Sequence, residues 1–167
     1  MSMIQQLLQE LEQEGQTTRR VLERVPEAHL AWKPHAKSMS LGQLAQHVAT
    51  TPGNVAQMAA QSRFQMPKFE QPTTATAAEL VPALERSLAQ AREVLAGFDD
   101  ARLGTMWTIV NGDREMMSLP VGAVLRSIML NHWYHHRGQL SVYLRELDVP
   151  LPSIYGPSAD ENPFAAA

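Results

Sequence analysis

Apolar residues recur with the period of an α-helix along most of the chain. From Met3 to about Arg24 they fall at i, i+3, i+4 and i+7, with Gln and Glu between them, which predicts an amphipathic helix. Pro26 should end this helix, because proline cannot continue the backbone hydrogen bonding. The same period from about Ala77 to Gly97 predicts another helix, with Thr76 as its N-cap and the terminal glycine as its stop. Because Pro82 does not suit a helix interior, a start nearer to this proline is the alternative.

A further helix is predicted to begin at Leu41. Ser40 and Gln43 form an S-x-x-Q capping box directly before a periodic apolar run, which is a typical start signal. Pro52 and Gly53 should bend this helix rather than end it, because the same apolar face continues beyond them. His47 lies one turn before that bend and is expected to face inward, near the rim of the apolar stripe.

The last long helix is predicted from Ser118 to Leu147, with Ser118 as its cap and Pro120 in its first turn. Residues 99–119 have no helical pattern, and Asn111-Gly112-Asp113 is a turn signal there. Either a short hairpin or an Ω-like crossover would fit. Four amphipathic helices with one long connection predict an all-α fold, a four-helix bundle with a crossover between the third and fourth helices, as a single domain over residues 1–167.

Three of the six histidines lie within five residues of the last helix, at His132, His135 and His136. On a helical wheel centred on His132, His136 shares its face one turn away, and the surrounding apolar residues place both in the middle of the buried stripe. His135 falls at the edge of the stripe, where a surface or interface role is favoured over proton shuttling. Arg137 falls on the opposite side, with the other arginines of this helix.

Two imidazoles at i and i+4 on a core-facing stripe allow two interpretations. Each could be a core histidine that is hydrogen-bonded to a neighbouring helix. A divalent metal is the favoured interpretation, because it accepts both lone pairs at once and this spacing lets two ring nitrogens converge on one ion. Two ligands are too few for a stable site, so a third is expected from another helix, and His47 is the natural candidate to join His132 and His136.

Composition narrows the class of protein. Hydrophobic residues make up 44% of the chain, with 9 methionines and few β-branched runs, which favours helical packing. The net charge of −3 and the absence of a basic run argue against nucleic-acid binding. No apolar run is long enough to predict a membrane span, and the N-terminus lacks the pattern of a signal peptide. The absence of cysteine removes thiolate ligands and disulfides, and a cytoplasmic location is expected.

Several motifs resemble those of one known family. Trp32-Lys33-Pro34-His35 and the segment from Ser38 to His47 are similar to the second-helix motif of the DinB (DinB/YfiT-like) family. Asn131-His132-Trp133-Tyr134-His135-His136-Arg137-Gly138-Gln139-Leu140 and the later Ile154-Tyr155-Gly156-Pro157 are similar to its fourth-helix signature and tail. The match spans nearly the whole chain. This is the damage-inducible metal-binding family, not the translesion polymerase of the same name.

The resemblance implies a homodimeric bundle that holds one divalent metal, usually zinc or nickel, through three histidines with water completing the shell. Carried over by motif, these are His47, His132 and His136. It also implies a metal-dependent enzyme that acts on a small-molecule substrate. A thiol S-transferase that uses a low-molecular-weight thiol is one form, and a hydrolase that uses activated water is a close variant. The alternative is a non-catalytic, stress-associated metal-binding dimer.

Some polar residues could assist the site. Gln43, one turn before His47, and Gln139, three residues after His136, are candidates to orient the imidazoles. Asp113, Glu115 and Glu146 are candidate general bases only if the crossover folds over the metal.

Overall fold

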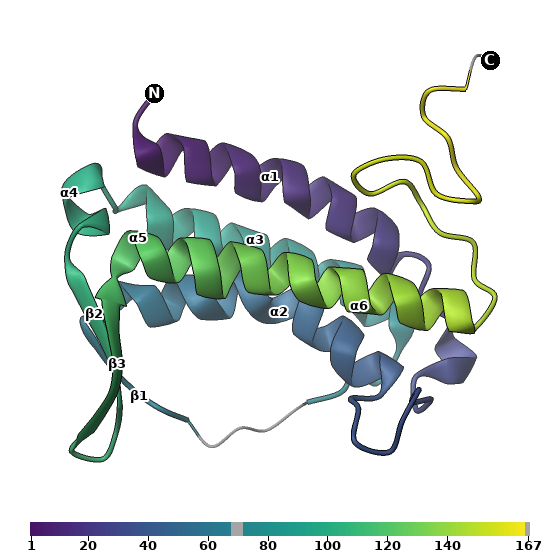
Figure 1. Cartoon of the computed structure of the whole chain (residues 1–167), viewed down its shortest axis with the longest axis horizontal. Coiled ribbons are helices and arrows are strands. Elements are labelled where there is room, and N and C mark those ends of the chain that lie inside the picture. Colours follow the sequence, from purple (N-terminus) through teal and green to yellow (C-terminus); the bar gives the residue numbers. More distant parts are fainter. Residues whose placement is uncertain (68–71, 166–167) are drawn as a thin grey trace.

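The computed structural model describes residues 1–67 and 72–165 and is mostly helical, with a small sheet at one end (Figure 1). Its long helices are α1 (Met3–Leu22), α2 (Leu41–Ala60), α3 (Leu80–Ala96) and a last stretch made of α5 (Val121–Val124), a π-helical segment (Leu125–Asn131) and α6 (His132–Glu146). The all-helical prediction therefore holds for most of the chain. It is wrong for the sheet, which the helical periodicity did not indicate.

Serine capping boxes begin the first two long helices. The predicted box at α2 is confirmed: Ser40 Oγ accepts the Gln43 N–H at 3.2 Å, and Gln43 Oε1 accepts the Ser40 N–H at 2.9 Å. Ser2 and Gln5 form an equivalent box at α1, with the same S-x-x-Q spacing. These reciprocal bonds satisfy N–H groups that a helix start otherwise leaves unpaired.

The helix α2 continues through Pro52 to Ala60, as predicted, and its axis changes direction along its length (Figure 1). The helix α3 begins at Leu80, later than Ala77 and nearer to Pro82, as the alternative start predicted. A short 3₁₀ helix (Ala77–Glu79) precedes Leu80, and the Thr76 side chain accepts no capping bond from a backbone N–H. Pro82 explains the late start, because proline is tolerated in the first turn of an α-helix but not in its interior.

The segment between α3 and α5 forms a hairpin, which is one of the two alternatives that the sequence allowed. After the short helix α4 (Asp100–Leu103), strands β2 (Met106–Asn111) and β3 (Arg114–Pro120) pair antiparallel. Gly112 lies in the turn with φ +61°, a conformation that favours glycine. Ser118 lies in β3 and its Oγ is 3.0 Å from Thr108 Oγ, so its predicted role as a helix cap is wrong.

A third strand, β1 (Arg63–Gln65), follows α2 and pairs in parallel with β2, so that Arg63 aligns with Thr108. The sheet order is β1-β2-β3. This sheet connects the C-terminal end of α2 to the segment that leads into α5. The two helical stretches that carry the three histidines of interest are therefore held together at this end by backbone pairing.

The hydrophobic core lies between the long helices. It is built mainly of Leu, Val and Ala side chains, together with the fully buried indoles of Trp107 and Trp133. The largest helix interface joins α2 to α3, and α2 also packs against α6. After Asp148, which has φ +57°, the tail runs over the surface and is attached to α1 by an ion pair between Arg20 and Glu161 (Figure 1).

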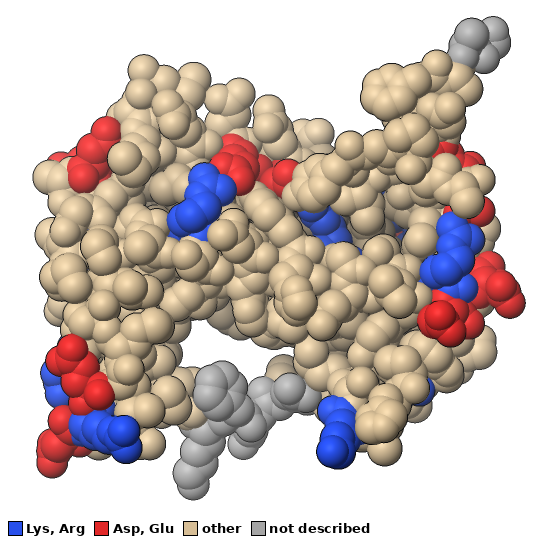
Figure 2. All heavy atoms as spheres, viewed as in Figure 1, with Lys and Arg blue, Asp and Glu red and all other residues tan. Residues whose placement is uncertain are grey.

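Charged side chains on the face seen in Figure 2 lie in small groups of both signs, and most of that face is uncharged. Several arginines are paired across elements, such as Arg92 with Glu12 and Arg126 with Glu10. Within the part of the chain that the structure describes, no helix combines the length and the apolar character that crossing a membrane requires.

Candidate metal centre

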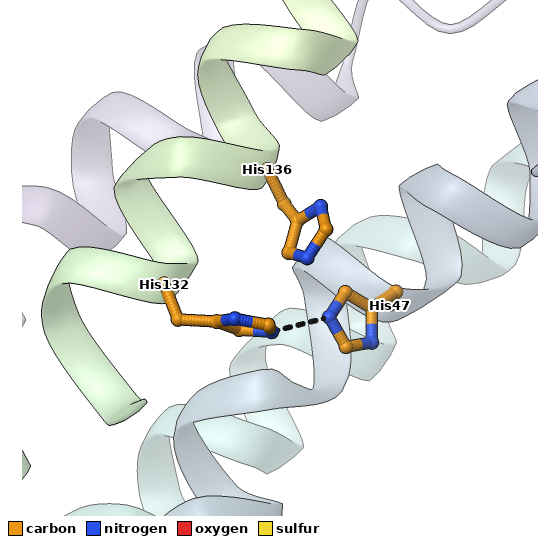
Figure 3. Close-up of side chains that lie close together, drawn as sticks. All are labelled: His47, His132 and His136. Atoms are coloured by element: carbon orange, nitrogen blue, oxygen red, sulfur yellow. Dashed lines mark hydrogen bonds between the residues drawn. The ribbon is translucent and has the colours of Figure 1, made fainter. Parts of the chain in front are cut away.

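Three histidine side chains converge between α2 and α6 (Figure 3). His47 comes from α2, and His132 and His136 come from successive turns of α6. Each ring offers a nitrogen, and these nitrogens lie within 4.8 Å of one another. His47 Nε2 is 3.0 Å from His132 Nε2. The structure therefore brings together the same three residues that the sequence indicated.

The histidines lie at the rim of the α2–α6 interface. All three are half-buried, whereas the centre of the buried stripe of α6 is formed by Trp133, Arg137 and nearby leucines. The rim position predicted for His47 is confirmed. The predictions that the α6 pair occupies the middle of the stripe and that Arg137 faces away from it are wrong. The wheel was centred on the histidines, and apolar periodicity does not register a buried arginine that is paired.

The surroundings of the site keep the imidazoles neutral. Burial lowers the pKa of His47, and the nearby His136 and His132 rings add to this effect because they would repel a second positive charge, so that the pKa falls to about 4. Burial is also the main cause of the lowered pKa values of His132 and His136. A neutral imidazole has a free lone pair, which is the form that binds a metal.

Gln139 orients one of the rings. Its Oε1 lies 2.7 Å from His136 Nδ1, so the proton of this ring is held at Nδ1 and the lone pair is left on Nε2, which faces the other two rings. This is the role that the sequence predicted for Gln139. Gln43 was also a candidate to orient an imidazole. Its Oε1 instead accepts the Ser40 N–H in the helix cap.

The donor set suits a divalent metal. Tetrahedral zinc with bonds of about 2.0–2.1 Å holds its nitrogen ligands roughly 3.3 Å apart, and the His47–His132 pair is at 3.0 Å. A direct Nε2–Nε2 hydrogen bond requires that one of these two rings carries a proton at Nε2. Binding of a metal would displace that proton, and the two lone pairs would then share one ion.

The predicted general bases do not lie at the site. Asp113 and Glu115 belong to the turn and second strand of the hairpin, which extends away from α6 (Figure 1). Glu146 is the last residue of α6, roughly 15 Å along the helix axis from His136. His135 is exposed, and its ring centroid lies 5.0 Å from that of His136. Among the described residues, the metal-ligating group at this site consists of histidines alone.

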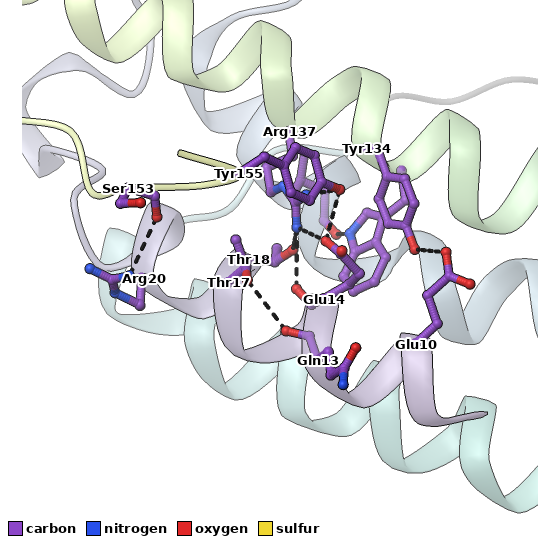
Figure 4. Close-up of polar contacts among 12 residues, drawn as sticks. Glu10, Gln13, Glu14, Thr17, Thr18, Arg20, Tyr134, Arg137, Ser153 and Tyr155 are labelled. Atoms are coloured by element: carbon purple, nitrogen blue, oxygen red, sulfur yellow. Dashed lines mark hydrogen bonds and ion pairs between the residues drawn. The ribbon is translucent and has the colours of Figure 1, made fainter. Parts of the chain in front are cut away.

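Sequence reasoning missed a second polar cluster, on the α1 side of α6 (Figure 4). Arg137 is 1% exposed, and its guanidinium lies 2.6 Å from Glu14 Oε2 and donates to Thr18 Oγ1 at 3.1 Å. It also donates to Tyr155 Oη at 2.6 Å, and that hydroxyl donates to Glu14. The Tyr134 ring lies beneath the guanidinium, at 5.3 Å. No local signal indicates this cluster, because Glu14 and Arg137 are 123 positions apart in the sequence.

Comparison with known proteins agrees with this fold. The DinB family model matches residues 1–163, and the chain belongs to the DinB family. A Bacillus subtilis relative, the uncharacterised protein YrdA, is 25% identical over 158 residues, which cover 92% of this chain and 89% of YrdA.

Solved structures of similar proteins share the fold. A DinB-like protein from Bacillus cereus has a TM-score of 0.69 at 24% identity, over 89% of this chain and 95% of its own. A DinB-like protein from Bacillus subtilis has a TM-score of 0.67 at 20% identity, over 89% and 97% of the two chains. A putative DinB family member from Exiguobacterium sibiricum has a TM-score of 0.60 at 21% identity, over 96% and 98%.

Proposed function

We propose that this protein binds one divalent metal ion, zinc or nickel, through His47, His132 and His136. The observation that supports the proposal is the convergence of three neutral, half-buried imidazoles from two helices, with their ring nitrogens within 4.8 Å. Nickel and zinc both suit an all-imidazole site. Structural zinc sites are usually closed by four protein ligands, often cysteines, whereas three ligands leave a position open.

The open position favours catalysis over a purely structural role. When bound, the metal would supply a positive charge that activates a thiol or a water molecule for attack on a small electrophilic substrate. Because the three imidazoles are neutral, none of that charge is cancelled by the protein. Their half-buried position at the rim of the interface leaves one side of the site accessible to a substrate.

We therefore infer a metal-dependent enzyme, of which a thiol S-transferase using a low-molecular-weight thiol is the first candidate and a hydrolase the second. The site contains no carboxylate among the described residues, which favours the thiol. A thiol ionises far more readily than water, so it needs a general base less. The alternative is a stress-associated metal-binding dimer without turnover.

The proposal extends to the assembly and its setting. We infer that the four long helical stretches form the four-helix bundle of the family within a single domain, that two copies form a homodimer, and that the protein acts in the cytoplasm on a small molecule rather than on nucleic acid. The mixed surface charges and the net charge of −3 support the last point. A sedimentation mass near 18.6 kDa at micromolar concentration would contradict the homodimer.

Elemental analysis tests the metal site directly. The wild type and a His132→Ala/His136→Ala double variant would be purified without an affinity tag and analysed for zinc and nickel. We expect about one equivalent of metal in the wild type and none in the variant. A folded wild type that contains no metal and takes up neither ion would contradict the proposal and identify the histidines as core residues.

Turnover assays on the metal-loaded protein separate the enzyme from the alternative. A panel of electrophiles would be offered with and without small thiols such as bacillithiol or mycothiol, and the double histidine variant would serve as the control. Metal-dependent consumption of an electrophile only with thiol supports the transferase, and consumption without thiol supports the hydrolase. A metal-loaded wild type no more active than the variant favours the non-catalytic dimer.

A further inference from the structure

Pro52 creates a bonding problem in α2 close to the metal site. Because proline has no N–H, the carbonyl of Val48, four residues earlier, loses its donor within the helix. Val48 is fully buried, and a buried carbonyl without a partner is costly. A donor from another part of the protein must therefore replace the missing bond.

The donor is Trp133 of α6. Its indole Nε1–H donates to Val48 O at 2.8 Å, and its side chain is fully buried. The next N–H of α2 is also satisfied from outside the helix, because Gly53 N donates to Ser87 Oγ of α3 at 2.8 Å. The interruption at Pro52 thus makes α2 bond to a specific side chain on each of its two neighbours.

The Trp133–Val48 hydrogen bond lies one residue along each helix from the contact between His132 and His47. Val48 follows His47 and Trp133 follows His132, so both contacts join residues that are 85 positions apart. Apolar contacts between two helices tolerate small sliding movements, because leucine and alanine side chains can repack at low cost. A single buried hydrogen bond has one satisfactory geometry and can therefore fix the register of two packed helices.

We propose that Trp133 is a positioning residue for the metal site. Its bond to the Val48 carbonyl that Pro52 leaves free sets the register of α6 on α2, and this register places His132 and His136 opposite His47. The inference rests on the proposed metal-binding function. It assigns a purpose to Pro52, which otherwise only weakens α2. Metal ligands need to be held within about 0.5 Å of their productive positions, by packing together with supporting hydrogen bonds.

The test distinguishes two effects of losing the indole N–H: a change in helix register and the destabilisation caused by an unpaired Val48 carbonyl. Trp133→Phe keeps most of the apolar volume but leaves Val48 O without a donor, so the variant could lose metal through misfolding. Adding Pro52→Ala supplies a backbone N–H that can bond to Val48 O within α2. The double variant therefore satisfies the carbonyl while it removes the bond between the helices. Pro52→Ala alone is the matched control, because a carbonyl accepts two bonds and the indole can stay in place.

Zinc affinity and the absorption spectrum of the cobalt-loaded protein would be measured for all four chains, together with urea unfolding. We expect Pro52→Ala to bind zinc within about threefold of the wild type. The double variant should unfold at a lower urea concentration than Pro52→Ala, because phenylalanine leaves a cavity at this fully buried position. Under conditions where both variants are folded, it should bind zinc about 10- to 100-fold more weakly, which is the usual effect of losing an outer support of a metal site. Its cobalt spectrum should also change, because the ligand arrangement changes.

Two other results are distinguishable. A double variant that binds zinc as tightly as Pro52→Ala, with an unchanged cobalt spectrum, would overturn the inference and leave Trp133 as a core residue only. Failure of the wild type itself to bind zinc, nickel or cobalt would overturn the proposed function, and this inference with it. If the double variant does not fold, the same comparison is made with 3-benzothienylalanine at position 133, which keeps the ring shape without the N–H.

Discussion

Two polar clusters lie on different sides of α6, and they differ in how completely the protein satisfies them. On the α1 side, the Arg137 guanidinium is enclosed by a carboxylate, two hydroxyls and two aromatic rings, and Glu14 balances its charge. On the α2 side, His132 and His136 face His47, a group of the same kind. Protonating one ring of this cluster makes protonation of the others less favourable.

This difference separates a structural cluster from a candidate binding site. Opposite charges and matched donors complete the Arg137 cluster, so an external ligand would add nothing to it. The histidines offer lone pairs that they cannot all use on each other, and a cation would satisfy them together. Buried polar residues beside one helix can thus be either structural or ligand-binding. The charge and the number of their hydrogen-bonding partners decide between the two roles.

The largest effect should follow from breaking the completed cluster. Arg137→Met leaves Glu14, whose side chain is 15% exposed, without its cation, and the loss of one partner of a buried pair costs about 3–5 kcal/mol of unfolding free energy. Urea unfolding of the metal-free proteins measures this. Arg126→Met is the matched control, because that arginine is 46% exposed and a surface pair contributes only about 0–1 kcal/mol. Equal losses in the two variants would contradict the comparison.

The stability of the histidine cluster should depend on whether a metal is bound. Zinc at 100 times its dissociation constant should raise the unfolding free energy of the wild type by about 2.7 kcal/mol, since it binds the folded chain. The His132→Ala/His136→Ala variant should gain nothing under the same conditions. Denaturant titrations with zinc or with a chelator give both values. Stabilisation of the variant as large as that of the wild type would place the metal elsewhere.

Removing Gln139, which orients the His136 ring, should have a smaller effect, seen in the zinc affinity. Gln139→Leu removes the acceptor of the His136 Nδ1 proton, so this ring is no longer held with its lone pair towards the other two. Zinc affinity should fall about tenfold, the lower end of the range for such supports. Gln139→Glu keeps an acceptor in place and should retain the affinity. Competition with a chromophoric chelator measures both, and an unchanged affinity in the leucine variant would dismiss the role of Gln139.

The pH dependence of the metal-free protein should show the smallest effect. The folded-state pKa of His47 is lowered to about 4, below its ordinary value near 6.5, so the unfolded chain binds more protons between these values. The stability linked to the neutral ring is therefore present above pH 6.5 and is lost as pH falls towards 4. Solvent around the half-buried ring reduces the size of the effect. His47→Gln should flatten the fall between pH 7 and 5, as measured by denaturant unfolding.

Local signals in the sequence were enough to predict where the long helices lie and that His132 and His136 share one face of the last helix. A capping box is formed by residues three positions apart, so Ser40 and Gln43 identify the start of α2 without any tertiary information. The spacing of His132 and His136 requires only that their segment is helical. The turn at Gly112 also had a local signal, but that signal did not decide between a hairpin and an Ω-like crossover.

Features that depend on distant partners could not be predicted. The strand β1 has only three residues, and its pairing with β2 is decided by where α2 ends. The π-helical segment Leu125–Asn131 changes the direction of side chains before His132, which a wheel of 3.6 residues per turn does not describe. Arg137 looked like a surface residue because hydropathy cannot report that Glu14 of α1 neutralises it.

The separation of 85 positions between His47 and His132 also determines when the site can form during synthesis. During synthesis at about 5–20 residues per second, the second ligand follows the first by roughly 4–17 seconds. Throughout that interval the nascent chain presents a single imidazole of this site, and α2 has no Trp133 to complete the bond that Pro52 leaves open. The proposed metal site is therefore completed only after α6 has been synthesised, and a metal held by all three histidines is taken up after that point.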